Sequence, residues 1–335
     1  MPARKPRLAL LLGDPAGVGP EMGVRLLANA ANLEACELLL VAPPSLLAAG
    51  ERIVGTKIPV LAAATREAVR FEPGRVALLA QREAEGGLPA LGQCSEAAGA
   101  IALEALATAT ALARSGFVDG IVFAPLNKHS LRLAGMREED ELRFMQGLFG
   151  VQGFTCEFNI TDGLWTSRVT SHVPVREVAD LITPQAVADA VHILHDALRR
   201  AGIVRPRIAV SGLNPHAGDG GSIGREEIEV IAPTVERLKR DGLEASGPWS
   251  PDTVFIAARR GDFDAVVSMY HDQGQIAMKL MGFERGVTLH GGLPVPVATS
   301  ASGSAFDIAG RGLARVDGLQ AAFDLCLRMA RQQLR

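Results

Sequence analysis

Short apolar runs and longer amphipathic segments alternate along the chain. The apolar runs are bounded by glycine, proline or other polar residues and predict strands at residues 8–12, 37–41, 118–123, 164–170, 207–213 and 265–270. Amphipathic or alanine-rich segments predict helices at residues 22–31, 95–115, 130–150, 183–201 and 226–241, with another at the C-terminus. Strands that alternate with helices are typical of an α/β fold with a largely parallel sheet.

Each of three histidines follows one of the predicted strands. His172 comes after residues 168–171, His216 after residues 208–215, and His271 after residues 265–270. The carboxyl ends of parallel strands meet at one edge of a sheet, where α/β proteins bind their ligands. One such histidine is more often structural than functional. Three from separate segments indicate a metal site or a catalytic cluster, although they lie too far apart in the sequence to form a local motif.

Charged residues accompany these histidines. Lys128 lies just past a predicted strand in a Pro-Leu-Asn-Lys context, which favours a functional role over the solvated position of most lysines. Asp272 follows His271 directly, and Asp252 lies in a loop that begins another element. The charged residues 137–143 have the pattern of a solvated helix face.

Three neutral imidazoles suit Zn²⁺ and similar divalent ions. Three protein ligands leave coordination positions open for a substrate. A hydroxyl that binds such an ion ionises more readily, which favours transfer of hydride from its carbon. On the residues alone, a metal site that assists oxidation and a metal-free catalytic cluster both stay open.

A glycine-rich loop at residues 13–21 follows the first predicted strand and precedes a helix. Its backbone N–H groups could face an anion at the helix start. The loop is neither the Gly-x-Gly-x-x-Gly motif of Rossmann folds nor a phosphate loop, because it lacks the Gly-Lys-Ser/Thr ending.

Composition excludes several classes of function. The net charge is −3 and only 4% of residues are aromatic, so a nucleic-acid partner is not expected. The first apolar run is too short for a signal peptide, and no run reaches the length of a membrane span. Four widely spaced cysteines favour reduced thiols in a cytoplasmic protein.

Motifs spread along essentially the whole chain resemble those of the 4-hydroxythreonine-4-phosphate dehydrogenase family. In order they are Gly-Asp-Pro-Ala-Gly-Val-Gly-Pro-Glu (13–21), Pro-Leu-Asn-Lys (125–128), Ser-His-Val-Pro (171–174), Gly-Leu-Asn-Pro-His-Ala-Gly (212–218), Pro-Asp-Thr (251–253), Met-Tyr-His-Asp-Gln-Gly (269–274) and Asp-Ile-Ala-Gly-Arg-Gly (307–312).

The resemblance implies a fold like that of isocitrate and isopropylmalate dehydrogenases, with two α/β domains, a cleft between them and no Rossmann motif. We expect a cofactor-side domain at residues 1–130 and about 290–335. The substrate, metal and dimer-interface domain is expected at about 131–289. A homodimer is implied, with shared active sites that each hold one divalent ion (Zn, Mg, Mn or Co) on His172, His216 and His271 drawn from both subunits.

The resemblance also implies a reaction. A hydroxyl of a small hydroxy acid is oxidised by NAD or NADP, and the product loses CO₂. Lys128 is the candidate for proton transfer, Asp252 is a second catalytic candidate, and Asp272 and Asn214 orient the metal ligands. The implied cofactor loop contains Gly303, Ser304, Ala305, Asp307, Ala309 and Gly310.

The substrate residues depart from the family pattern. Residues 140–143 stand where the family has Gly-His-Thr-Glu, Val297 replaces an Arg that contacts the substrate phosphate, and Ser302 replaces a His of the cofactor loop. The positions that correspond to substrate contacts are Glu141, Leu142, Arg143, Lys279, Thr288 and Val297.

A phosphate dianion without its Arg would be poorly compensated. We therefore expect a non-phosphorylated acid, such as the cis-dihydrodiol of an aromatic carboxylate, which a sister branch of the family oxidises. In that case Arg143 is expected to face a substrate carboxylate. The alternatives are oxidation of 4-phosphohydroxy-L-threonine in pyridoxal phosphate biosynthesis, or a catalytically inactive binding homologue.

Overall fold

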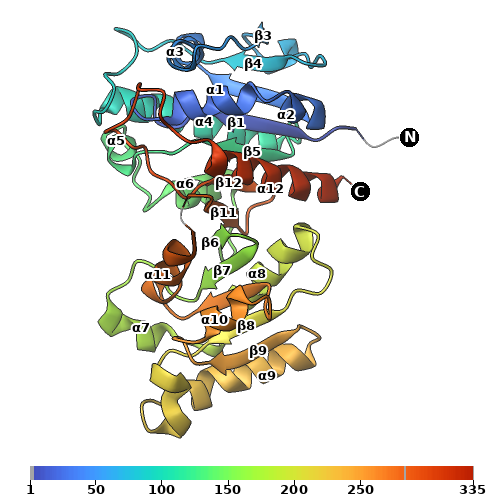
Figure 1. Cartoon of the computed structure of the whole chain (residues 1–335), viewed down its shortest axis with the longest axis vertical. Helices are drawn as coiled ribbons and strands as arrows, with labels where there is room; N and C mark the ends of the chain where they lie inside the picture. Colours follow the sequence, from blue (N-terminus) through green and yellow to red (C-terminus); the bar gives the residue numbers. More distant parts are fainter. Residues whose placement is uncertain (1–3, 283, 335) are drawn as a thin grey trace. The chain divides into compact units, whose positions relative to one another are not determined.

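The structure is a computed structural model that describes residues 4–282 and 284–334. The chain forms two compact units, each built from strands and helices (Figure 1). Unit 1 holds the described residues up to Gln152, together with Val287–Leu289 and those from Leu293 onward. Unit 2 holds the described residues of Gly153–Gly286 and also His290–Gly292. The domain boundaries expected from the sequence stay a prediction.

Unit 1 follows the alternation of strands and helices expected from the sequence. Its elements are β1 (Arg7–Leu11), α1 (Gly19–Leu27), α2 (Ala30–Ala35), β2 (Glu37–Ala42), α3 (Pro44–Val54), β3 (Val60–Ala63), η1 (Arg66–Ala68), β4 (Val76–Ala80), α4 (Glu96–Arg114), β5 (Gly120–Phe123), α5 (Lys128–Leu133), α6 (Glu141–Phe149), β11 (Val287–Gly291, shared with unit 2), β12 (Val297–Ser300) and α12 (Asp317–Gln333).

The strands of unit 1 lie in the order β3-β4-β2-β1-β5-β12-β11. The first six strands in this order are parallel to one another, and β11 is antiparallel to β12. Alternate side chains of a strand point to opposite faces of a sheet. Ala9 and Leu11 of β1 therefore share one face, where they are buried with Leu106 and Leu112 of α4. Helix α12 packs against β5 and β12.

Unit 2 has the elements β6 (Cys156–Thr161), β7 (Leu164–Arg168), α7 (Val175–Leu181), α8 (Pro184–Arg200), β8 (Ile208–Ser211), η2 (Pro215–Gly221), η3 (Glu227–Ile231), α9 (Ala232–Arg240), β9 (Ala245–Trp249), α10 (Val254–Arg259), β10 (Ala265–Ser268) and α11 (His271–Gly282). Its strands lie in the order β6-β7-β10-β8-β9. Only the β6–β7 hairpin is antiparallel among the described pairs of this unit. The expected α/β class with largely parallel strands is thus confirmed.

The helix expected over residues 130–150 is wrong as a single element. The structure has α5 and α6, separated by residues 134–140. The break follows from local chemistry, because Gly135 adopts a positive φ of 95° and Asp140 caps α6. The Oδ1 atom of Asp140 accepts the backbone N–H of Arg143 at 2.9 Å. Asp140 is therefore buried as a cap and is not part of a solvated helix face.

Helix α4 is the core helix of unit 1. By length and composition it could cross a membrane, but 56% of its apolar window is buried inside the protein. Its Gly99 lies against α5, where a Cβ atom would come within 1.9 Å of the Ser130 carbonyl oxygen. Glycine at this position therefore allows α5, which begins at Lys128, to pack closely on α4.

We expect Gly99→Ala to destabilise the protein by about 2 kcal/mol, the usual cost of an overpacked contact. The gain in helix propensity, about 1 kcal/mol, is smaller than this cost because the clashing atom belongs to the backbone. Gly147→Ala in α6 is the matched control, since its Cβ would meet nothing within 4 Å and should stabilise the helix. Chemical unfolding at fixed protein concentration measures both. An unchanged midpoint for Gly99→Ala would contradict this account of the packing.

Candidate functional site

Three histidines lie beyond the carboxyl ends of adjacent parallel strands in unit 2. Strand β10 pairs in parallel with both β7 and β8, so the three strands end at the same edge. His172 follows β7, His271 is the first residue of α11 after β10, and His216 lies in η2 after β8. The expected arrival of all three at strand ends holds in the structure.

Two of these histidines face one cavity. The ring centroids of His172 and His271 are 5.6 Å apart, with 42° between the ring planes. The cavity, about 160 Å³ in volume, is also lined by Asp272, Tyr270 and Thr170. Among residues 4–282 and 284–334, however, the groupings of metal-ligand side chains whose ligand atoms lie within 4.8 Å of one another do not include the three histidines together.

The backbone is strained at two of the histidines. His172 has φ of 51° and His216 has φ of 53°, in the left-handed region that residues other than glycine seldom adopt. Ala217 and Asp219, beside His216, have φ of 52° and 44°. Such conformations cost free energy and persist where surrounding contacts hold them, most often at functional sites.

Hydrogen bonds tie the three histidine segments together. The backbone N–H and hydroxyl of Thr170 both donate to the Met269 carbonyl, at 3.0 and 2.9 Å, which joins the segments of His172 and His271. The Gln273 amide joins the segments of His271 and His216. Its Oε1 accepts the N–H of Met269 at 2.8 Å, and its Nε2 donates to the carbonyl of Gly212 at 3.1 Å.

Asn214 holds the loop that carries His216. Its Nδ2 donates to Glu226 and Glu227 at 2.7 and 3.0 Å. The buried Glu227 also accepts the backbone N–H groups of Leu213 and Asn214, at 2.8 and 2.7 Å. Sequence reasoning missed the roles of Glu227 and Gln273, because their bonds to the backbone of residues 212–214 join segments that only folding brings together.

Two aspartates contact or approach the histidines. Asp272 Oδ1 lies 2.7 Å from Nδ1 of His271, which leaves the Nε2 atom of that ring as the possible metal ligand. Asp252 is exposed and accepts the Ser250 hydroxyl at 2.6 Å. This hydrogen bond, together with the nearby His216, lowers the pKa of the Asp252 carboxyl. Lys279 is exposed on α11.

Lys128 lies in unit 1, at the start of α5. Asn127 caps this helix, and its Oδ1 accepts the N–H groups of His129 and Ser130, each at 3.0 Å. The loop before Lys128 is fixed to the glycine-rich loop, since the Asp14 N–H donates to the Pro125 carbonyl at 2.9 Å. Lys128 itself is exposed just beyond the carboxyl end of β5.

The expected cofactor loop docks on the glycine-rich loop of unit 1. Ser304 accepts the N–H of Val18 through its carbonyl at 3.0 Å, and a Cβ on Gly17 would come within 2.7 Å of the same oxygen. Buried Glu21 accepts the N–H groups of Gly312 and Ala314, at 2.9 and 2.8 Å. The glycine-rich motif therefore anchors residues 304–314, a role that its local pattern did not reveal.

Buried polar atoms without hydrogen-bond partners lie on the same loops. In the described part of the chain they include the Oδ2 atom of Asp14 and the Oγ atom of Ser304. Burial raises the pKa of the Asp14 carboxyl. Of the other expected cofactor contacts, Gly303 and Asp307 are exposed, while Ala305, Ala309 and Gly310 are half-buried.

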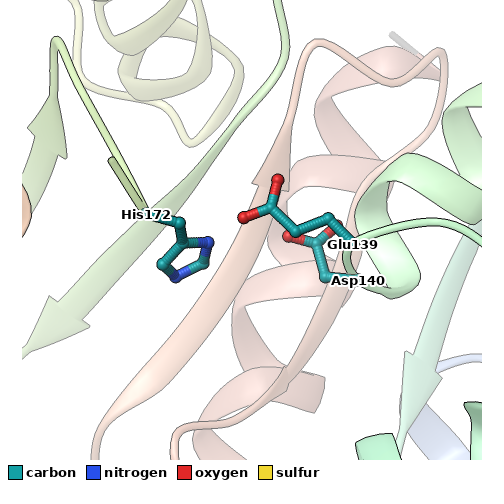
Figure 2. Close-up of side chains that lie close together, drawn as sticks. All are labelled: Glu139, Asp140 and His172. Carbon is teal, nitrogen blue, oxygen red and sulfur yellow. The ribbon is translucent and has the colours of Figure 1, made fainter. Parts of the chain in front are cut away.

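The expected substrate residues of unit 1 have different environments. Leu142 and Val297 are buried in the hydrophobic core, whereas Thr288 is half-buried in β11. Figure 2 shows Glu139 and Asp140 directly before α6, whose first residue is Glu141. The Glu141 Oε2 atom is buried without a hydrogen-bond partner. Arg143 is exposed and donates to the Gln146 side chain at 2.9 Å.

Comparisons with known proteins place these residues in a family context. The family model described as "Pyridoxal phosphate biosynthetic protein PdxA" matches residues 34–326. A protein of Pseudomonas aeruginosa named "Putative 4-hydroxythreonine-4-phosphate dehydrogenase 2" is 48% identical over 331 residues, which cover 98% of each chain.

Two solved structures are similar over nearly the whole chain. A 4-hydroxythreonine-4-phosphate dehydrogenase from Klebsiella pneumoniae has a TM-score of 0.84 and 34% identity, with 98% of this chain and 99% of that chain covered. A terephthalate 1,2-cis-dihydrodiol dehydrogenase from Burkholderia xenovorans LB400 has a TM-score of 0.69 and 26% identity, with 97% and 98% covered.

Proposed function

Because the chain belongs to the family of pyridoxal phosphate biosynthetic protein PdxA, we propose that it is a metal- and NAD(P)-dependent dehydrogenase. It oxidises a hydroxyl of a small carboxylated substrate, with coupled decarboxylation. The observation that carries the proposal is the arrival of His172, His216 and His271 at one edge of the unit 2 sheet. The family resemblance, which includes relatives named dehydrogenases, supports the same reaction class.

The residues at this edge fit a divalent cation. Imidazole nitrogens are good ligands for Zn²⁺ and Co²⁺, and a carboxylate that hydrogen-bonds the other ring nitrogen, as Asp272 does for His271, is the usual support for such a ligand. Mg²⁺ and Mn²⁺ remain within the proposal. When bound, the ion would stabilise negative charge that develops on substrate oxygen.

A homodimer with shared active sites belongs to the proposal. Within one chain, the rings of His172 and His271 lie close together. Among the described residues, however, the ring nitrogens of all three histidines do not lie within 4.8 Å of one another. A ligand set drawn from two subunits accommodates that separation.

Other residues have distinct proposed roles. Lys128 transfers a proton to or from the substrate, and Asn214 and Asp272 keep the histidine segments oriented. Asp252 lies close enough to His216 for the two to interact electrostatically, which supports its place in the site.

NAD or NADP is proposed to bind along the loop from Gly303 to Gly310. The Oγ atom of Ser304 and the Oδ2 atom of Asp14, buried without partners, fit hydroxyl and amide groups of such a ligand. Glu21 holds the end of this loop through two backbone N–H groups and so keeps its shape. We expect the protein to act in the cytoplasm.

We propose a non-phosphorylated acid as the substrate, such as an aromatic-carboxylate cis-dihydrodiol. Val297 and Leu142, at positions where the family has polar phosphate and substrate contacts, are buried in an apolar core and offer no charge. Exposed Arg143 is proposed to face a substrate carboxylate, whereas Lys279, which matches a phosphate-binding lysine of the family, is exposed as well. The name of the relative that is 48% identical favours the second candidate, 4-phosphohydroxythreonine oxidation.

Reduction of NAD⁺ and NADP⁺ by purified protein tests this proposal. We expect turnover with at least one hydroxy acid or dihydrodiol, loss of turnover after chelation, and recovery when Zn²⁺, Co²⁺, Mn²⁺ or Mg²⁺ is returned. 4-Phosphohydroxythreonine serves as the competing substrate, and its preferred oxidation would decide for the biosynthetic activity. Turnover that is indifferent to chelation would reject the metal-dependent mechanism. No turnover and no nucleotide binding would favour an inactive homologue.

A further inference from the structure

We infer that Arg168 is a positioning residue. It holds the segment that carries His172 and the segment that carries His271 in fixed positions relative to each other, so that both imidazoles can bind one metal ion. Its guanidinium holds the loop of His172 directly and reaches the helix of His271 through the side chain of Asn159 and that of Gln275. This inference rests on the proposed metal site. All the residues that carry it lie in unit 2.

The guanidinium of Arg168 is buried and contacts three protein side chains. Arg168 is the last residue of β7 and is only 6% exposed. Its Nε donates to Ser171 Oγ at 2.9 Å, its Nη1 to Asn159 Oδ1 at 3.0 Å, and its Nη2 lies 3.2 Å from Glu157 Oε2. One planar fork therefore fixes three side chains in different directions.

The Ser171 bond restrains the backbone next to His172. Ser171 directly precedes His172, whose φ of 51° is unfavourable for a residue with a side chain. A strained residue keeps its conformation only when surrounding contacts impose it. The bond from Arg168 to Ser171 closes this short turn back onto the strand and supplies such a contact.

The Asn159 bond extends the restraint to α11. Oδ1 of Asn159 accepts Nη1 of Arg168 and also Nε2 of Gln275, the latter at 2.6 Å. Gln275 lies four residues after His271 on α11, so both residues are on the same face of that helix. A shift of Arg168 would therefore be transmitted to the rotation of the helix that begins with His271.

Glu157 balances the charge of Arg168. Glu157 and Asn159 lie two residues apart on β6, so their side chains point to the same face of the sheet. Helix α11 packs against β6. A buried ion pair adds little stability compared with apolar side chains of the same size, so we infer that this pair serves to fix a geometry. Here the geometry is that of two imidazoles whose centroids are 5.6 Å apart.

The test compares two double variants that each remove one ion pair from unit 2. Arg168→Leu with Glu157→Leu removes the network without leaving a lone charge. Arg207→Leu with Asp264→Leu is the matched control, because that pair lies at the amino ends of β8 and β10, opposite the histidine edge. Binding of Co²⁺ alone to the full chain is followed by its visible absorption, beside the unfolding midpoint.

We expect the Arg168/Glu157 variant to raise the Kd for Co²⁺ by about 10- to 100-fold, the usual effect of losing a residue that orients a metal ligand. The control should leave that Kd unchanged even if its unfolding midpoint falls. If the Kd is unchanged in the Arg168/Glu157 variant while His172→Ala abolishes Co²⁺ binding, the inference about Arg168 is overturned and the proposed metal site stands. Co²⁺ binding that is absent, or that survives His172→Ala, overturns the proposed metal site and this inference together.

Two milder substitutions keep the inference falsifiable if the double variant does not fold. Ser171→Ala removes only the acceptor beside His172, and Gln275→Ala removes only the link to α11. Each should weaken Co²⁺ binding in the parent chain. Where the double variant folds, neither should weaken it further in that background. Unchanged Co²⁺ affinity in both single variants, or an equal additional loss in both backgrounds, overturns the role of Arg168.

Discussion

Replacing His271 with alanine is expected to lower the rate of NAD(P)⁺ reduction by about a hundredfold or more. A divalent ion contributes several kcal/mol to stabilising charge in the transition state, and each 1.36 kcal/mol corresponds to a factor of about 10 in rate. Removing the ring deletes one of three proposed ligands and leaves Asp272 without the imidazole that it contacts. Steady-state kinetics at saturating Co²⁺ or Zn²⁺, together with the bound-metal content, measures the effect.

His192→Ala is the matched control for this substitution. His192 lies exposed on α8 and takes no part in the histidine segments at the strand ends. We expect its variant to retain both metal content and rate. If His271→Ala retained the parent rate and metal content, His271 would be excluded as a ligand, and the cavity that it lines with His172 would need another explanation.

Replacing Lys128 with alanine is expected to lower kcat by about 10²- to 10⁴-fold, the range over which a positioned proton donor or acceptor contributes to a rate. Lys128 is held at the start of α5 by the Asn127 cap, so the loss should come from the missing amine and not from a displaced loop. The pH profile of kcat should also lose one limb. Metal content and nucleotide affinity should stay at parent values.

Two further variants separate proton transfer from charge. Lys128→Arg keeps a positive charge but cannot give up a proton at ordinary pH, so it should be nearly as slow as the alanine variant. His129→Ala, at the exposed neighbouring position, should leave kcat unchanged. Full activity in Lys128→Arg would show that the residue acts through its charge and not as a proton carrier.

The local features of the chain were predicted well where a strong pattern fixed them. The apolar runs that became β1, β5 and β10 are buried strands, and the alanine-rich segment became α4. The single helix expected over residues 130–150 was wrong, because Gly135 and the capping side chain of Asp140 interrupt the helix between α5 and α6. Such interruptions depend on φ and on one side-chain hydrogen bond, to which periodicity is insensitive.

The placement of His172, His216 and His271 after strands, and of Lys128 after another strand, was determined by the sequence alone. This succeeded because strand patterns are local and parallel strands end at a common edge. Only the tertiary structure decided which residues hold the histidine segments and the loop of residues 304–314 in place. Glu21, Gln273 and Arg168 each bridge segments far apart in the chain, through backbone groups or through another side chain. Their partners are selected by folding, so no spacing in the sequence could have identified them.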